Sequence, residues 1–272
     1  NCETPLTLHL DLKEKLLCHH CGYTRKKPNK CPQCNSEQIR EYGLGSEKVE
    51  AEIQSMFPQA RTLRWDWDTT RQKDAHEMIL THFANRQADV LVGTQMLAKG
   101  LDLPMVTLVG IVLADVGLSL PDPFASEKVF QTLTQVAGRA GRSSRGGKVV
   151  LQTFMPEHYA IQFAAHHDVN GFYERELEYR KQLGYPPYAK LVRLEYRHVD
   201  NVKAEEESQV LAGRLKVKIE ADALRQTELI GPVPSFFAKE NGEYRWQIIV
   251  RGPNPALLLR DIKLSDWRIE ID

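Results

Sequence analysis

Residues 106–114 read Val-Thr-Leu-Val-Gly-Ile-Val-Leu-Ala, an almost unbroken apolar run. Such a run is typical of a strand that is buried on both faces, as strands of a parallel sheet are. Three other segments, 61–65, 89–93 and 148–154, also have the character of strands. Together they predict an α/β domain that is built on a parallel sheet.

Amphipathic helices alternate with these strands. Ser46 is placed to cap the first helix, a second is expected over 72–84, and a third opens at Ser126 and leads into Gln135. The residues expected to face inward on the first two are Val49, Ile53, Met56, Ala75, Met78, Ile79 and Phe83. The alternation places the α/β domain over residues 43–156.

The remaining segments differ in character from this domain. Residues 1–42 are short, polar and rich in cysteine, which predicts a zinc-binding module truncated at its start. Residues 157–184 are predicted to be a helical connection. It ends at Tyr185-Pro-Pro-Tyr188, because consecutive prolines cannot continue a helix. A strand, a helix and a second strand are then expected at 189–197, 201–220 and 244–251. They predict a small α+β domain over 185–272.

Charge is balanced over the whole chain, with 36 basic and 36 acidic residues. This balance gives no support to a nucleic-acid function. Locally, residues 139–148 contain four basic residues and no acidic one, namely Arg139, Arg142, Arg145 and Lys148. This group of basic residues could bind the phosphates of a nucleotide or of a nucleic-acid backbone. An ordinary solvent-exposed surface explains it equally well.

The sequence leads us to expect neither a membrane span nor a signal peptide. No apolar run approaches the length that spans a bilayer, so we expect no membrane partner. The chain opens at Asn1 without a signal peptide, and we expect it to be an excised piece of a longer protein. The cysteine pattern indicates a reducing, cytoplasmic setting.

Four of the five cysteines form two pairs, Cys18-x-x-Cys21 and Cys31-x-x-Cys34. Two thiolate pairs on tight turns are typical of a tetrahedral zinc site. One four-cysteine site is the simplest interpretation, and it leaves Cys2 without a role. Free structural cysteines and a redox dithiol are the alternatives.

The most specific motif runs from Gln135 to Arg142 and reads Gln-Val-Ala-Gly-Arg-Ala-Gly-Arg. Its two arginines, Arg139 and Arg142, each follow a glycine, and permanently charged planar guanidiniums suit a γ-phosphate during transfer. The alternative is a helix end that neutralises its own dipole. No phosphate loop of the form G-x-x-x-x-G-K-[ST] occurs in the chain, so most of such an ATP site would lie elsewhere.

A second motif, Gly93-Thr-Gln-Met-Leu-Ala-Lys-Gly-Leu-Asp102, directly follows a strand. Backbone amides and hydroxyls at a strand end suit phosphates, and a carboxylate suits a ribose. Alone, this motif is only moderately specific for a nucleotide site. Because Gln135 to Arg142 follows it later in the chain, the two motifs together are much more specific.

With these motifs the chain resembles the second RecA-like lobe of superfamily 2 helicases and, more narrowly, the primosomal replication-restart helicases of the PriA family. The resemblance covers nearly the whole chain. The stretches that support it are 18–22, 31–34, 43–47, 66–70, 93–100, 118–122, 135–142, 185–188 and 231–234. It implies a parallel sheet with helices on both faces. A different superfamily 2 translocase, such as a RecG-like one, does not account for the cysteines.

The resemblance implies an ATP-dependent DNA helicase that moves 3′ to 5′, recognises abandoned forks and reloads the replicative helicase. Arg139 and Arg142 would reach the γ-phosphate of ATP and Mg²⁺ held by a missing lobe, with Gln135 nearby. Asp102 and Gly100 would lie near the nucleotide, and Thr94 and Gly100 near the tracking strand. Branched DNA, single-stranded DNA-binding protein and primosome proteins are the implied partners. The chain by itself is expected to be inactive.

The resemblance also changes the reading of the cysteines, because the family has two interleaved zinc sites. Cys2, Cys18 and Cys21 would be three ligands of one site. Cys31 and Cys34 would be half of the other, whose partners would precede Asn1. The sequence is therefore compatible with one zinc ion or with two.

Some residues depart from the family pattern. Pro123-Phe124 stands where the family has Pro-Asp-Phe-Arg, so an arginine contact is missing. In the last domain, Tyr244, Arg245 and Trp246 either stack on bases or belong to the core of a strand. A non-catalytic zinc and DNA-binding adaptor is the alternative function.

Overall fold

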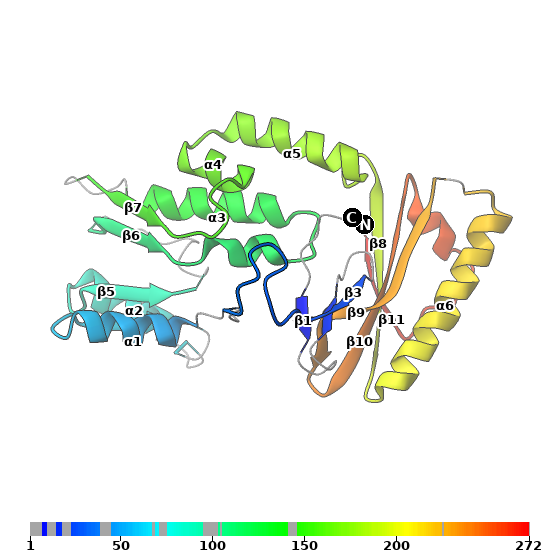
Figure 1. Cartoon of the computed structure of the whole chain (residues 1–272), viewed down its shortest axis with the longest axis horizontal. Helices are drawn as coiled ribbons and strands as arrows, with labels where there is room; N and C mark the ends of the chain where they lie inside the picture. The colour runs from blue at the N-terminus through cyan, green and yellow to red at the C-terminus, as the bar shows by residue number, and fades with distance from the viewer. Residues whose placement is uncertain are drawn as a thin grey trace. The chain divides into compact units, whose positions relative to one another are not determined.

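The chain forms two units with their own internal contacts (Figure 1). The terminal unit comprises Asn1–Asn35, Leu118–Ser126 and Tyr173–Asp272, and the central unit comprises Ser36–Gly117 and Glu127–Phe172. The structure is a computed structural model, and it describes residues 7–9, 15–17, 23–38, 45–66, 69–70, 75–94, 103, 105–140, 146–224 and 226–271.

Two pairs of parallel strands lie in the central unit. Strand β4 (Thr62–Trp65) pairs with β5 (Val90–Gly93), and β6 (Leu108–Ile111) pairs with β7 (Lys148–Leu151). All four strands fall inside the segments expected from the sequence. The prediction of an α/β fold with parallel strands is thus confirmed.

Helices alternate with these strands along the chain, and the 3₁₀ helix among them was not expected. They are α1 (Ser46–Met56), α2 (Ala75–Ala84), the 3₁₀ helix η2 (Ala114–Ser119), α3 (Ala125–Ala140), α4 (Tyr159–Ala165) and α5 (Val169–Leu183). Phe130 on α3 and Phe172 on α5 stack in the core of the central unit, with ring centroids 3.9 Å apart. Both side chains are almost fully buried, which fixes α3 against the start of α5.

Ser46 does not cap α1, contrary to the prediction. It is the first residue of the helix, Gly45 is the N-cap, and no side chain caps the end. The hydroxyl of Ser46 instead donates to Asp66 Oδ2 at 2.6 Å. A tertiary partner therefore competes successfully with the local capping bond.

The expected burial of several apolar residues is also wrong. Leu108 is 60% exposed and Val150 is 54% exposed, so the β6–β7 pair is not buried on both faces. Met56 and Met78, expected to face inward, are 71% and 56% exposed. Periodicity shows which side of an element is apolar, but it does not show that this chain supplies a cover for that side.

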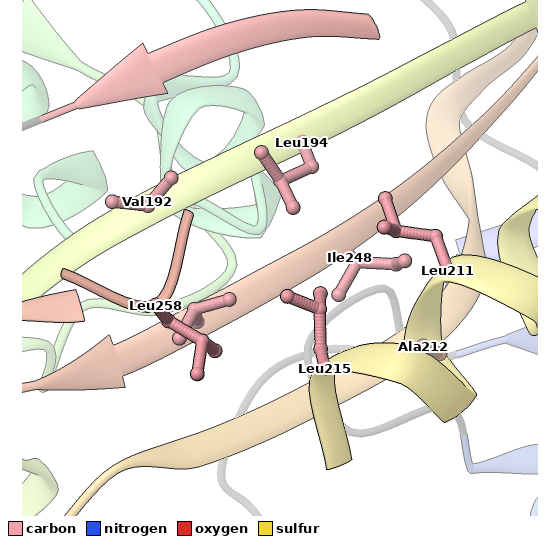
Figure 2. Close-up of a cluster of buried hydrophobic side chains, with 8 residues drawn as sticks. Val192, Leu194, Leu211, Ala212, Leu215, Ile248 and Leu258 are labelled. Atoms are coloured by element: carbon pink, nitrogen blue, oxygen red, sulfur yellow. The ribbon is translucent and has the colours of Figure 1, made fainter. Parts of the chain in front are cut away.

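The terminal unit contains a four-stranded antiparallel sheet in the order β11-β8-β10-β9. Its elements are β8 (Lys190–His198), α6 (Asn201–Ala221), β9 (Glu228–Glu240), β10 (Glu243–Gly252), the 3₁₀ helix η3 (Pro255–Leu259) and β11 (Trp267–Ile271). Helix α6 packs on β8, β9 and β10. Figure 2 shows the core between them, made by Val192, Leu194, Leu211, Ala212, Leu215, Ile248, Val250 and Leu258. The small α+β fold expected here is present, with two further strands.

Three short strands, β1 (Thr7–His9), β2 (Lys15–Leu17) and β3 (Thr24–Lys26), form a separate antiparallel sheet within the terminal unit. Elsewhere, none of the helices in the described residues combines the length and apolar character that a membrane span needs. The domain bounds 1–42, 43–156, 157–184 and 185–272 remain predictions.

Candidate nucleotide and metal sites

Helix α3 carries the first part of the arginine motif. The carboxylate of Asp122 accepts from the amide of Phe124 at 2.8 Å, just ahead of the first turn. At the other end, Gln135 is exposed and Arg139 is half-buried. Residues four apart lie on one face of a helix, so both side chains start from the same side of α3. The structure thus brings these two predicted residues together, while Arg142 lies outside the described residues.

Gly138 directly precedes Arg139 on the helix, and it is exposed. A Cβ built at Gly138 would meet no atom within 4 Å. Among the described residues, no close approach requires the glycine. The space beside it is open to a ligand or to another protein segment.

The strand ends of the β4–β5 pair carry polar residues. Thr94 directly follows β5 and is exposed, whereas Gly100 and Asp102 of the same motif lie outside the described residues. Because β4 and β5 are parallel, their carboxyl ends lie at one edge, where ligands of α/β sheets commonly bind. The location of Thr94 is therefore compatible with ligand contact.

Asp66 directly follows β4 and begins the family-like stretch 66–70, and it is the centre of a polar network that this resemblance did not predict. It accepts hydrogen bonds from Ser46 and from the amide of Thr69, and Arg64 Nε lies 2.9 Å from its carboxylate. Burial opposes ionisation, but these hydrogen bonds and the charge of Arg64 outweigh it, and the pKa of Asp66 is lowered. The carboxylate therefore ties α1 to β4 as an anion.

Asp115 holds a corresponding position after β6. It accepts from Thr153 Oγ1 at 2.6 Å and from the amides of Phe154 and Met155, which follow β7. Burial again opposes ionisation, and the hydrogen bonds from Thr153, Phe154 and Met155 nevertheless leave the pKa of Asp115 lowered. The signal in the sequence was a lone carboxylate immediately after the apolar run 106–114. It joins the ends of β6 and β7.

Two of the five predicted metal ligands, Cys31 and Cys34, lie in the described residues, and they share one tight turn. The amide of Asn35 donates to the carbonyl of Cys31 at 2.8 Å, and Asn35 has a positive φ of 56°. Hydrogen bonds from the amides of Cys34 and Gln33 lower the pKa of the Cys31 thiol. A turn whose amides favour a thiolate suits half of a tetrahedral zinc site.

The other cysteines, Cys2, Cys18 and Cys21, lie outside the described residues. Within the residues that are described, no three side chains of the metal-binding types form a group. The residues at hand fit two ligands of a site and do not distinguish one ion from two.

In the terminal unit, Trp246 is buried and its Nε1 donates to Asn201 Oδ1 at 3.0 Å. Trp246 is therefore a core residue of β10, which was the alternative to stacking on bases. Arg245 Nη2 lies 2.6 Å from Glu195, and Lys239 Nζ lies 4.6 Å from the centre of the Tyr244 ring. All three side chains thus have partners inside the protein.

Comparison with known proteins identifies two domains by their family models. Residues 47–144 match the helicase conserved C-terminal domain, and residues 181–271 match the primosomal protein N C-terminal domain. Both matches lie where the described α/β and α+β elements lie.

Curated relatives match along the chain. The replication restart protein PriA of Bacillus subtilis is 43% identical over 274 residues, which is 100% of this chain and 33% of the relative. The PriA protein of Synechocystis is 40% identical over 281 residues, again 100% of this chain and 33% of the relative. That of Haemophilus influenzae is 35% identical, covering 97% of this chain and 35% of the relative. The chain thus spans about a third of the length of these relatives. From these matches and the two domains, we conclude that the chain belongs to the PriA family of replication restart proteins.

Proposed function

We propose that the chain supplies the second half of an ATP site in a DNA helicase of replication restart. The observation that supports this most strongly is the pairing of Gln135 and Arg139 on one face of α3, beside the open space at Gly138. This end of α3 falls inside the segment that matches the helicase C-terminal domain.

In this proposal Arg139 and Arg142 act as arginine fingers. Their guanidiniums neutralise the charge that spreads over the γ-phosphate oxygens during transfer, and Gln135 orients groups beside them. Gly100 and Asp102 contact the nucleotide, and Thr94 and Gly100 contact the DNA strand. ATP and Mg²⁺ are held mainly by a phosphate-loop lobe, because no phosphate loop occurs among the 272 residues.

The substrate in the proposal is branched or forked DNA, on which the enzyme moves 3′ to 5′ in a cytoplasmic setting. Single-stranded DNA-binding protein and primosome proteins are its partners. The names of the similar proteins, which act in replication restart, and the primosomal domain over 181–271 support this substrate and these partners.

Zinc belongs to the proposal as a structural ion. Bound zinc would hold the turns of the cysteine module together, since so short a segment buries little apolar surface. Cys31 and Cys34 supply two thiolates from one turn. With one ion, Cys18 and Cys21 complete the tetrahedral shell, and with two ions Cys2, Cys18 and Cys21 are ligands of the other site.

The test of the arginine assignment is Arg139→Ala in a protein where this chain is joined to its phosphate-loop lobe. Loss of an arginine finger should lower DNA-stimulated ATP hydrolysis about 10³-fold and leave binding to forked DNA unchanged. Lys128→Ala is the matched control, because Lys128 is an exposed cation on the same helix, eleven residues earlier. Unchanged hydrolysis in Arg139→Ala would show that the arginine-finger assignment is wrong.

The half-site proposal also predicts that the chain alone hydrolyses no ATP, even with forked DNA present. Turnover above that of the Arg139→Ala chain would contradict it. Elemental analysis gives the zinc content separately, and Cys31→Ser should lower it by one ion or reduce its retention against a chelator. Retention of all zinc in Cys31→Ser would remove that cysteine from the ligand set.

A further inference from the structure

Helix α3 takes part in both units of the chain. Its first two residues, Ala125 and Ser126, lie in the terminal unit, and residues 127–140 lie in the central unit. The helix continues without a break up to Ala140. Because each residue of an α-helix turns by a fixed angle and rises by about 1.5 Å, the orientation of the first turn determines where the side chains of the last turn point. Arg139 belongs to that last turn.

A guanidinium lies over the residue just ahead of this helix. Arg180 Cζ, on α5, is 4.6 Å from the centre of the Phe124 ring. Both residues belong to the terminal unit. Arg180 Nη1 also lies 3.5 Å from the carbonyl oxygen of Pro186. Arg180 therefore joins three segments, namely the residues ahead of α3, α5 itself and the turn ahead of β8.

The charge of Arg180 has a buried counter-charge. Its Nε donates to Glu176 Oε1 at 2.7 Å, one turn earlier on α5. Glu176 is 1% exposed and Arg180 is 6% exposed. A buried ion pair adds little stability over an apolar pair of similar volume, but it restricts the guanidinium to one position, on which the ring of Phe124 packs. We call Glu176, Arg180 and Phe124 the α5 clamp.

A second contact between α3 and α5 lies in the central unit, where Phe130 stacks on Phe172. The chain runs from Phe124 to Phe130 against the direction in which it runs from Phe172 to Arg180, so the two contacts hold antiparallel segments at two levels. The α5 clamp fixes the residue ahead of α3, and the ring stack fixes the second turn of the helix. Arg139 lies beyond both contacts on the same helix.

The α5 clamp also connects segments that match different family domains. Phe124 lies in the segment 47–144, which matches the helicase conserved C-terminal domain. Arg180 directly precedes the segment 181–271, which matches the primosomal protein N C-terminal domain, and Pro186 lies inside it. A structural change at the start of the primosomal domain can therefore reach the helix that carries Arg139.

We propose that Arg180 is a positioning residue for Arg139 and that it acts through α3. With the α5 clamp in place, the last turn of α3 directs the Arg139 guanidinium at the γ-phosphate. Without the clamp the helix still forms, but this guanidinium is displaced. A displacement of about 1 Å lowers a rate by up to about 10²-fold, so Arg180 controls hydrolysis without touching ATP. This inference rests on the proposed arginine-finger function.

The test replaces the ion pair by apolar residues in a protein where this chain is joined to its phosphate-loop lobe. The clamp variant, Glu176→Leu with Arg180→Met, should stay folded, because apolar residues of similar volume commonly replace a buried ion pair without loss of stability. Thermal unfolding verifies this. Its kcat for DNA-stimulated ATP hydrolysis should fall about tenfold or more, with KM for ATP and binding to forked DNA unchanged. Arg175→Met with Glu178→Leu, an exposed pair 2.6 Å apart on the same helix, is the matched control and should keep the wild-type kcat.

A double-variant cycle with Arg139→Ala separates this inference from the proposed function. Once Arg139 is removed, the clamp variant should lower kcat no further, because both changes remove the same contact. A wild-type kcat in the clamp variant, or a full further loss on top of Arg139→Ala, would overturn the inference and leave the arginine finger standing. Unchanged hydrolysis in Arg139→Ala would overturn the proposed function and this inference with it.

The ring of Phe124 provides a second test of the route through α3. Phe124→Leu removes the aromatic face under the guanidinium and should also lower kcat, whereas Phe124→Tyr keeps that face and should retain the wild-type value. Both variants are measured with the same ATP hydrolysis assay. Full activity of Phe124→Leu would contradict transmission from Arg180 to the start of α3.

Discussion

The parallel strand pairs of the central unit and the antiparallel sheet of the terminal unit contrast in how they are covered. In the terminal unit Leu194, Leu215 and Ile248 are completely buried between sheet and helix. In the central unit Leu108 and Val150 remain largely exposed on the β6–β7 pair, and α1 has no buried residue at all. A parallel sheet is stable when both faces are covered, whereas an antiparallel sheet needs only one. The terminal sheet therefore has its own core, whereas the described part of the chain covers the parallel pairs incompletely.

Leu215→Ala should have the largest effect on this comparison. Removing a fully buried leucine from the core in Figure 2 should lower the free energy of unfolding by about 3 kcal/mol, through lost burial and a new cavity. Leu108→Ala on β6 should cost less than about 1 kcal/mol, because its side chain is already exposed. Urea unfolding of both variants measures the difference. Equal losses of free energy of unfolding in the two variants would contradict the difference in cover between the two sheets.

Glu195→Gln should have the next largest effect on the free energy of unfolding. Glu195 on β8 is buried, and Arg245 and Arg197 lie 2.6 and 2.9 Å from its carboxylate. Loss of the anion leaves the two guanidiniums with only the half-exposed Glu240 as counter-charge, so we expect a cost of about 2 kcal/mol. Thermal unfolding of this variant, beside Arg193→Gln at a half-exposed pair, is the measurement. If Arg193→Gln proves as costly, burial is not what strengthens the Glu195 network.

Acid should destabilise both units, through different carboxylates. The pKa of Glu195 is lowered because hydrogen bonds and charges from Arg245 and Arg197 outweigh its burial, and those of Asp66 and Asp115 are lowered by their own hydrogen bonds. A lowered folded-state pKa means that the stabilisation is complete above about pH 4–5, the range of ordinary carboxyl groups, and is lost as the pH falls through the folded value.

Urea midpoints measured between pH 6 and pH 3 test this dependence. Glu195→Gln should make the slope for the terminal unit shallower, and Asp115→Asn should do so for the central unit. A slope that neither variant changes would assign acid sensitivity to other groups.

The smallest expected effect is at the start of α6. Asp200 caps this helix by accepting from the amide of Val202 at 2.9 Å. Asp200→Ala should cost about 1 kcal/mol, and Asp200→Asn should recover most of it, since an amide oxygen also accepts at this position. Chemical unfolding of the two variants gives the values. Equal losses in both would mean that the charge, and not the cap, matters.

Periodicity predicted the order of elements better than their burial. The apolar run at 106–114 and the spacing within α1 and α2 identified a strand and two helices correctly. The same patterns wrongly predicted cover for Leu108, Met56 and Met78, because burial depends on what lies opposite. In the terminal unit, β9 was not predicted, and it contains Pro232 and Pro234, which disfavour a central strand. It forms at the edge of the sheet, where a missing amide is tolerated.

By itself the sequence determined the succession of strands and helices, the α/β character of the middle of the chain and the motif from Gln135 to Arg142. These depend on local propensity and spacing, which each segment carries alone. Only the tertiary structure decided that Asp66 and Asp115 hold strand ends, that Trp246 belongs to the core and that Val210 on α6 is exposed. Those features depend on which residues far apart in the chain become neighbours, and no local pattern specifies such contacts.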